Sequence, residues 1–244
     1  MNTERIELLD LPLDVVTMDG AVAWVRARLN APDPAQVVTL NPEIIVRSLR
    51  DPELRRALRE AELVTPDGVG VLWATRRLFG RTLPERVTGV DLTLALFEGL
   101  AGELRVYFLG GKPGVAERAA RAAAERYGVR AAGVQHGYFE DEAGVVAAVA
   151  TSGANLLLAG LGERQETFLW RHKRALGVPV MIGVGGTLDV LAGEARRTPA
   201  WARRVGLEWL LRVGLDPKRW PRAWRLLRFV LTVEQARRRS PTRG

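Results

Sequence analysis

The most regular feature of the sequence is a series of short apolar runs, each bounded by turn residues. Runs of this length, rich in Val, Leu and Ile, are typical of strands buried in a parallel sheet. We expect five such strands: Val37 to Leu40, Leu63 to Val64, Arg105 to Leu109, Asn155 to Ala159, and Val178 to Val184.

Longer segments of helical composition alternate with these runs. They cover Asp51 to Ala61, Gly114 to Tyr127, Ala143 to Ala150, and Thr167 to Leu176. Strands that alternate with helices of roughly 10 to 15 residues predict an α/β fold with a mainly parallel sheet. Ligands of such sheets bind beyond the carboxyl ends of the strands. The turns that follow the five runs are therefore the places to look for chemistry.

Positive charge is concentrated in the C-terminal part of the chain. From Arg196 to Gly244 there are 14 basic and 3 acidic residues and four of the seven tryptophans, whereas the other 195 residues hold 22 basic and 25 acidic. We therefore divide the chain into a body at 1–195 and a basic, Trp-rich helical appendage at 196–244. Such an appendage favours an anionic surface as partner.

One segment of the appendage has helical spacing. Trp220, Trp224, Leu227 and Leu231 recur at steps of four and three, so they share a helix face that arginines flank. Two interpretations fit this pattern: an amphipathic helix lying in a membrane interface, or a terminal helix packed on the core with a solvated arginine face. The spacing alone does not separate them.

Composition narrows the chemistry further. There is no cysteine, which excludes disulfides, thiolate metal sites and a cysteine nucleophile, and the two histidines argue against a histidine-rich metal site. No run approaches the roughly 18 apolar residues of a membrane-spanning helix. The N-terminal residues lack the pattern of a signal peptide, so we expect no secretory leader.

Two glycine-rich turns follow predicted strands. In LGGKPG, Gly110 and Gly111 let a ligand approach the backbone, and the helix that follows favours an anion at its start. In GVGGTLD, Gly185 and Gly186 precede Asp189, which is placed to accept a hydrogen bond from a ribose or a base. A plain tight turn and a helix cap explain the same residues. Two such turns in one sheet favour a nucleotide ligand.

The turns after the first two strands carry polar side chains. Thr39 and Asn41, in TLNPE, are good caps for a helix that begins with proline, and Asn41 is equally suited to bind a sugar or a phosphate. Asp67, in TPDG, is either a turn residue or a catalytic base at the lip of the sheet. Arg86, in RVTGVD, and Gln165, in GERQE, carry no meaning by spacing alone.

Taken in order, these pieces resemble a known family. They are TLNPEIIV, TPDGVGV, RVTGVDL, YFLGGKPGVAERAA, GVQHGYF, RQE, IGVGGTLDVLAGEARRTPAW and GLEWLLRVGLDPKRWPR, and they cover residues 37–222. The ordered set resembles the WecG/TagA/CpsF family, glycosyltransferase family 26, whose members act in wall teichoic acid, enterobacterial common antigen and capsule synthesis.

The resemblance implies a Rossmann-like α/β enzyme, with the sheet flanked by helices. It implies inverting transfer of N-acetylmannosamine from UDP-N-acetylmannosamine to a GlcNAc acceptor linked to polyprenyl diphosphate. Asp67 is then the general base, and the other catalytic candidates are Thr39, Asn41, Arg86 and Gln165. One departure is Glu163, which stands where the family often has a proline.

The substrate-binding candidates come from the glycine-rich turns, from GVQHGYF and from the tail arginines that the resemblance implies to fold over the active site. They are Gly110, Gly111, Tyr138, Gly185, Gly186, Asp189, Arg212, Arg219 and Arg222. The chain contains no D-x-D triplet for a metal, so we expect no cofactor and no metal, with arginine side chains stabilising the departing diphosphate.

The expected partners are a UDP-sugar donor, a polyprenyl-diphosphate-linked acceptor and an anionic membrane surface that the appendage reaches. The expected location is the cytoplasm, on the inner face of the plasma membrane. Alternatives are a member of the same family with another UDP-sugar, and a basic nucleic-acid-binding protein. The body has no RNA-binding motif, so we expect no nucleic acid. A nicotinamide-dependent oxidoreductase of the same fold class is a further alternative. Against it, this chain has no G-x-G-x-x-G motif near the first predicted strand.

Overall fold

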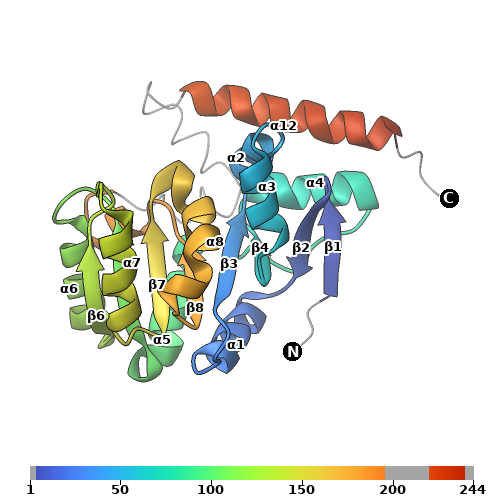
Figure 1. Cartoon of the computed structure of the whole chain (residues 1–244). Helices are drawn as coiled ribbons and strands as arrows, with labels where there is room; N and C mark the ends of the chain where they lie inside the picture. Colours follow the sequence, from blue (N-terminus) through green and yellow to red (C-terminus); the bar gives the residue numbers. More distant parts are fainter. Residues whose placement is uncertain (1–3, 196–219, 240–244) are drawn as a thin grey trace.

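The structure, a computed structural model, describes residues 4–195 and 220–239, and for 220–223 it describes the backbone alone. Its centre is a six-stranded sheet in the order β4-β3-β8-β7-β5-β6, with every neighbouring pair parallel (Figure 1). The strands are β3 (Ala35–Leu40), β4 (Leu63–Pro66), β5 (Arg105–Gly110), β6 (Arg130–Gln135), β7 (Leu156–Gly160) and β8 (Val180–Gly183). The predicted α/β fold is confirmed.

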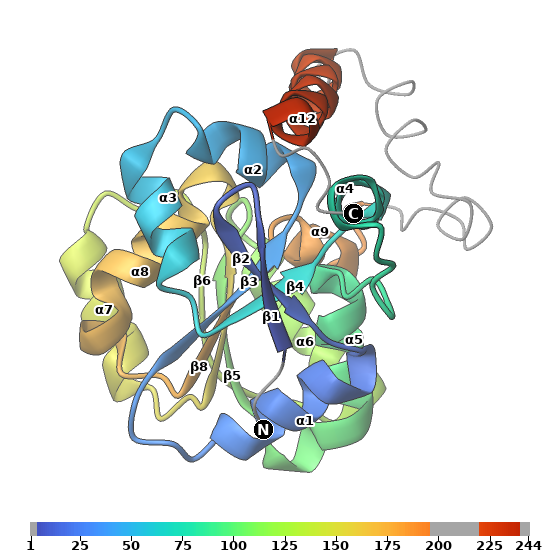
Figure 2. The ribbon, with the colours of Figure 1, turned by 90° about the vertical axis from the view of Figure 1, so that its right-hand side faces the viewer.

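Helices cover both faces of this sheet (Figure 2). One core packs α1, α5, α6 and α9 on one face, and other cores pack α3, α7 and α8 on the opposite face. The helices are α1 (Met18–Arg28), α2 (Pro42–Ser48), α3 (Pro52–Arg59), α4 (Val69–Phe79), α5 (Gly89–Leu100), α6 (Val115–Tyr127), α7 (Glu142–Thr151), α8 (Gln165–Leu176), α9 (Thr187–Leu191) and α12 (Trp220–Arg239), with short 3₁₀ turns η1 (Ala101–Glu103) and η2 (Gly162–Arg164). The four predicted helical segments correspond to α3, α6, α7 and α8.

Strand β5 shows why the apolar runs do not alternate with polar residues. Phe108 packs in the core under α5, with its ring centroid 6.3 Å from that of Phe97. Its neighbours Tyr107 and Leu109 point to the opposite face, into the core under α7 and α8. Successive side chains of a strand alternate between faces, so a strand covered on both sides is apolar throughout. Each fully buried Leu or Phe stabilises the fold by roughly 1.5–3 kcal/mol.

An antiparallel hairpin, which the apolar pattern did not predict, covers the β4 edge of the sheet. It consists of β1 (Glu4–Leu8) and β2 (Leu11–Val15). Asp14 is buried, and its Oδ2 accepts a hydrogen bond from the backbone N–H of Val64 at 2.7 Å. Both oxygens of Asp14 also accept from Arg5 at 2.8 Å. The hairpin thereby provides a hydrogen-bond acceptor for a backbone N–H of the edge strand β4, which would otherwise be left unpaired.

The C-terminal helix α12 lies across the end of the molecule toward which β3 and β7 point (Figure 1). It packs on α2 and α4 through Phe229 and Val233, which are fully buried. Trp224, Leu227 and Leu231 are 72%, 48% and 53% exposed. The helix therefore packs on the core, as one interpretation of its spacing predicted, and still presents the apolar stripe that the other interpretation requires.

The division of the chain into 1–195 and 196–244 stays a prediction. Within the two described ranges, no helix has both the length and the apolar composition needed to cross a bilayer.

Candidate active site

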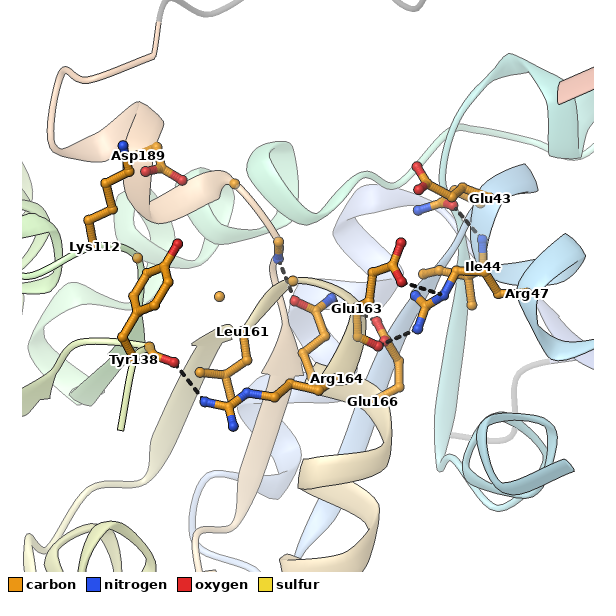
Figure 3. A pocket seen from close by; sticks show the side chains of 18 of the residues that line it. Glu43, Ile44, Arg47, Lys112, Tyr138, Leu161, Glu163, Arg164, Glu166 and Asp189 are labelled. Carbon is orange, nitrogen blue, oxygen red and sulfur yellow. Dashed lines mark hydrogen bonds and ion pairs between the residues drawn. The ribbon is translucent and has the colours of Figure 1, made fainter. Parts of the chain in front are cut away.

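A cavity of about 770 Å³ opens at the carboxyl edge of the sheet. Its walls come from the segments that directly follow β3, β5, β6, β7 and β8, as expected for ligand sites of parallel sheets. Figure 3 shows the lining side chains, with Lys112, Tyr138 and Asp189 on one side and Glu43 and Arg47 on the other.

Glycines let three strand ends approach closely behind this cavity. Gly110 has φ 141°, and a Cβ built there would lie 2.3 Å from the carbonyl oxygen of Gly160. A Cβ on Gly160 would in turn lie 2.7 Å from the carbonyl oxygen of Gly185. Because no side chain fits at either position, this side of the cavity presents backbone to whatever binds there.

The structure brings half of the fourteen predicted residues together in the wall of this cavity. Seven of them line the cavity: Asn41, Gly111, Tyr138, Gln165, Gly185, Gly186 and Asp189. Gly110 is the last residue of β5, where it pairs with Gly160 of β7, and it does not line the cavity. Asn41 also caps α2, because its Oδ1 accepts from the backbone N–H of Ile44 at 3.0 Å. The capping interpretation of Asn41 is thus confirmed, and it is compatible with a place in the cavity wall.

Gln165 is held at both ends of its side-chain amide. Its Oε1 accepts from the backbone N–H of Gly185 at 3.0 Å, and its Nε2 donates to Oε1 of Glu166 at 2.7 Å. The amide lies against Gly183, where a Cβ would stand 2.9 Å from Nε2. Thr39 reaches the same glycine from β3, since its Oγ1 donates to the carbonyl oxygen of Gly183 at 3.5 Å. Thr39 is buried and lies just outside the cavity lining.

Asp67 lies one strand further along the edge. It follows β4 directly, is half-buried, and donates its backbone N–H to the carbonyl oxygen of Leu40 at 2.8 Å. Gly68, with φ 91°, then begins the turn into α4. The turn is therefore tied to the end of β3, next to the cavity but outside its lining.

The RVTG segment joins the same neighbourhood. The backbone N–H of Val87 donates to Pro66 at 2.9 Å, and Thr65 Oγ1 donates to the carbonyl oxygen of Val87 at 2.9 Å. These two bonds fix Arg86 beside the turn that carries Asp67. The site thus has two parts: the cavity, and a neighbouring group of Thr39, Asp67 and Arg86 at the ends of β3 and β4.

The tail arginines give a partial result. Arg212 and Arg219 lie outside the described residues, and the side chain of Arg222 is not described. Arg225, which the sequence did not single out, forms ion pairs with Glu43 and with Glu163, the latter at 2.7 Å. Both acids line the cavity. The hydrogen bond that Arg225 donates to Glu163, together with the nearby carboxylate charges, raises the pKa of Arg225.

Six charged residues in the cavity wall were not among the predicted site residues: Glu43, Arg47, Lys112, Glu163, Arg164 and Glu166. Lys112 stands inside LGGKPG and Glu166 follows Gln165, so both were within recognised motifs. Glu166 is 2% exposed, and burial raises its pKa to about 7. Arg164 donates to the carbonyl oxygen of Gly137 at 2.6 Å, which holds the loop that carries Tyr138. Among the residues in the described ranges, no three His, Cys, Asp or Glu side chains gather as a possible metal site.

Comparison with known proteins agrees with this arrangement. The family model described as "Glycosyl transferase WecG/TagA/CpsF family" matches residues 6–243. Two relatives carry the name N-acetylglucosaminyldiphosphoundecaprenol N-acetyl-beta-D-mannosaminyltransferase. The one from Bacillus spizizenii is 32% identical over 84% of this chain and 81% of its own length. The one from Bacillus subtilis is 30% identical over 85% of this chain and 82% of its own length. The chain therefore belongs to the WecG/TagA/CpsF family of glycosyl transferases.

Proposed function

We propose that this protein is an inverting glycosyltransferase of cell-surface polysaccharide synthesis. It moves N-acetylmannosamine from UDP-N-acetylmannosamine to a GlcNAc residue carried on polyprenyl diphosphate. The observation that carries the proposal is the cavity at the carboxyl edge, because several segments that resemble motifs of the family line it, and the TPDG and RVTG segments lie at neighbouring strand ends. The names of the two Bacillus relatives support the acceptor and the transferred sugar.

The donor fits the part of the cavity that backbone groups form. Gly111, Gly185 and Gly186 leave room for a diphosphate beside the strand ends, and Lys112 supplies a positive charge in the wall. Asp189 and Tyr138, on the same side in Figure 3, contact the ribose and the base in this proposal.

Asp67 is the general base in this proposal. The acceptor hydroxyl forms a bond to the anomeric carbon, the bond from that carbon to UDP breaks, and its electron pair stays on the diphosphate. The hydroxyl proton passes to the Asp67 carboxylate. Such a base contributes roughly 10²- to 10⁴-fold in rate when it reaches the hydroxyl at about 2.6–3.2 Å. The tie between its backbone and Leu40 supports this role, since it holds the turn that carries Asp67 against the end of β3.

Cationic side chains stabilise the leaving UDP without a metal ion in this proposal. The sequence has no D-x-D triplet, while Arg86 is fixed near Asp67 and Lys112 lines the cavity. Fixed cations aimed at a developing charge are among the stronger devices of catalysis. The tail arginines Arg212, Arg219 and Arg222 are further candidates for the same task.

The lipid-linked acceptor calls for a membrane surface, and α12 offers one contact. Its exposed Trp224, Leu227 and Leu231 form an apolar stripe, and the exposed arginines at 237–239 follow on the same helix. Apolar stripes flanked by basic residues bind interfaces of anionic lipid. This supports a peripheral position on the cytoplasmic face of the plasma membrane.

A transfer assay tests the proposal. Radiolabelled UDP-N-acetylmannosamine and other UDP-sugars are offered with a short-chain polyprenyl-diphosphate-GlcNAc, with and without EDTA. Transfer of N-acetylmannosamine that EDTA leaves unchanged is expected. Transfer of another sugar would make this protein a member of the family with a different donor. Loss of transfer in EDTA, restored by a divalent metal, would overturn the role given to the arginines.

The membrane contact has its own test. Full-length protein with Trp224→Ser, Leu227→Ser and Leu231→Ser should lose co-sedimentation with vesicles of anionic lipid and keep its affinity for UDP. The control carries serine at exposed Glu117 of α6, far from this stripe in sequence. Unchanged sedimentation of the triple variant would contradict this contact.

A further inference from the structure

Beneath the cavity, one carboxyl group is buried without full compensation. Glu166 lies in the first turn of α8 and is 2% exposed. Its Oε1 accepts from Gln165 Nε2 at 2.7 Å, and its Oε2 has no hydrogen-bond partner among the described residues. A buried polar atom left in this state destabilises a fold by about 1–3 kcal/mol. A buried carboxyl group with one unpaired oxygen therefore needs an explanation.

The contact with Gln165 supplies one. A backbone N–H only donates, so the bond from Gly185 requires the oxygen of the Gln165 amide to face it. The nitrogen then faces Glu166. An amide nitrogen carries two hydrogens, and Glu166 takes one of them, which leaves the other for a ligand in the cavity that Gln165 lines.

We propose that Glu166 is a positioning residue, whose buried carboxyl clamps the Gln165 amide so that its second N–H points at an oxygen of the bound substrate. This inference rests on the proposed function, because it gives Gln165 a substrate to contact. Gly183 takes part by having no side chain, since a Cβ there would displace the amide nitrogen.

A second buried amide supports Glu166 from below. Gln36 of β3 is fully buried and donates its Nε2 to the backbone carbonyl of Glu166 at 3.0 Å. This bond fixes the start of α8 against the sheet. Like Glu166 Oε2, Gln36 Oε1 has no partner in the described part of the chain. The chain of hydrogen bonds from Gln36 through Glu166 to Gln165 thus contains two buried oxygens without partners, which lower the stability of the fold. Such local losses of stability are common at functional sites.

The charges around Glu166 are few. Arg47 of α2 lowers its pKa and Glu43 raises it, and both effects are smaller than the effect of burial. The neighbouring η2 turn carries Glu163 and Arg164. On the helices packed against α8, the nearby carboxylates are paired, Glu53 with Arg171 and Glu142 with His172, and β3, β7 and β8 contribute no titratable side chain.

The contact can be tested without any turnover. In ¹⁵N-labelled full-length protein, the side-chain NH₂ signal of Gln165, assigned by its loss in Gln165→Leu, should shift with pH around a midpoint near the raised pKa of about 7. In Glu166→Gln, which keeps an oxygen acceptor and cannot titrate, the signal should stay constant across this range. A wild-type signal that does not titrate, or one that titrates equally in Glu166→Gln, would overturn the clamp.

Kinetics then test the consequence for transfer. Glu166→Leu removes the acceptor, and we expect a fall in kcat of about 100-fold, typical of a misplaced group, with UDP affinity unchanged. Glu166→Gln should restore kcat to within a few-fold. A normal kcat in Glu166→Leu beside a slow Gln165→Leu would overturn the positioning role alone. A normal kcat in Gln165→Leu would instead overturn the place of Gln165 in the proposed function.

Discussion

The two parts of the site at the carboxyl edge differ in the groups that they present, which are backbone in one part and side chains in the other. Around β5, β7 and β8 the chain presents backbone, because Gly110, Gly160 and Gly185 bring strand ends within contact of one another. At the ends of β3 and β4 the relevant groups are side chains: Thr39 within β3, and Asp67 in the turn after β4, whose backbone N–H donates to the carbonyl oxygen of Leu40. Under the proposed function, the backbone part binds the UDP-sugar donor, and the side-chain part accepts the proton of the acceptor hydroxyl.

The same comparison separates two kinds of tolerance to mutation. Where the backbone itself forms the surface, any side chain is an obstruction, and loss of binding accompanies loss of stability. Where a side chain acts alone, its removal leaves the fold intact and slows the reaction. Four substitutions test this distinction.

The largest effect is expected at the side-chain part. Asp67→Asn should lower kcat by about 10²- to 10⁴-fold, because an amide cannot accept the hydroxyl proton. Affinity for UDP and the thermal midpoint should stay close to wild type, since asparagine suits the same turn. A transfer rate near that of wild type would return Asp67 to the role of a turn residue.

The backbone part should respond in the opposite way. Gly110→Ala places a Cβ 2.3 Å from the carbonyl oxygen of Gly160 at φ 141°, and we expect it to lower the free energy of unfolding by about 3 kcal/mol together with UDP affinity. Gly128→Ala, also at positive φ but with no atom within 4 Å of its Cβ, is the control and should cost about 1 kcal/mol. Equal effects of the two in denaturant unfolding would contradict the close approach.

Glu166 gives a pH-dependent prediction. Its folded pKa of about 7 lies above its ordinary value of 4.5 because burial disfavours the carboxylate. Below pH 4.5 it is protonated in both states, and as the pH rises from 4.5 to 7 the unfolded state alone ionises, so stability falls by roughly 3 kcal/mol. Glu166→Gln should remove this fall and be the more stable protein at pH 8. Urea unfolding at pH 4, 6 and 8 measures it, with Glu117→Gln on exposed α6 as control.

The smallest effect is expected where the two parts are linked. Arg225 of α12 pairs with Glu43, which follows β3, and with Glu163, which follows β7. Because the three side chains are about one-third to two-thirds exposed, Arg225→Ala should change stability by at most about 1 kcal/mol. We expect a few-fold fall in transfer to vesicle-bound acceptor. Arg121→Ala at an exposed position of α6 should change neither.

The sequence predicted the parts of this fold that depend on one strong pattern. Apolar runs located β3, β4, β5, β7 and β8, because burial on two faces leaves few polar residues. The Ala- and Arg-rich segment located α6. Strand β6 was missed, since its sequence RAAGVQ lies half-exposed at the sheet edge and contains little to mark it. The β1–β2 hairpin turns at Leu9 and Asp10, both with φ near +55°, and neither residue type signals such a turn.

The site followed the same rule. Strand ends and glycines are visible in a sequence, and seven of the fourteen predicted site residues line one cavity. Glu166 was missed, because nothing in the letters RQE says that the glutamate is buried or that its neighbour depends on it. The pairing of Arg225 with Glu163 joins residues 62 positions apart, and such distances lie beyond local patterns.

The position of α12 has one further consequence. The helix is held on the body by buried Phe229 and Val233 and by the ion pair of Arg77 with Glu234. The direction of its exposed face is therefore fixed without any contact with lipid. That face and the cavity belong to the same end of the molecule (Figure 1). A bilayer that contacts Trp224 and its neighbours would thus lie alongside the opening of the cavity. A lipid-linked sugar could then reach the site without any change in the orientation of the helix.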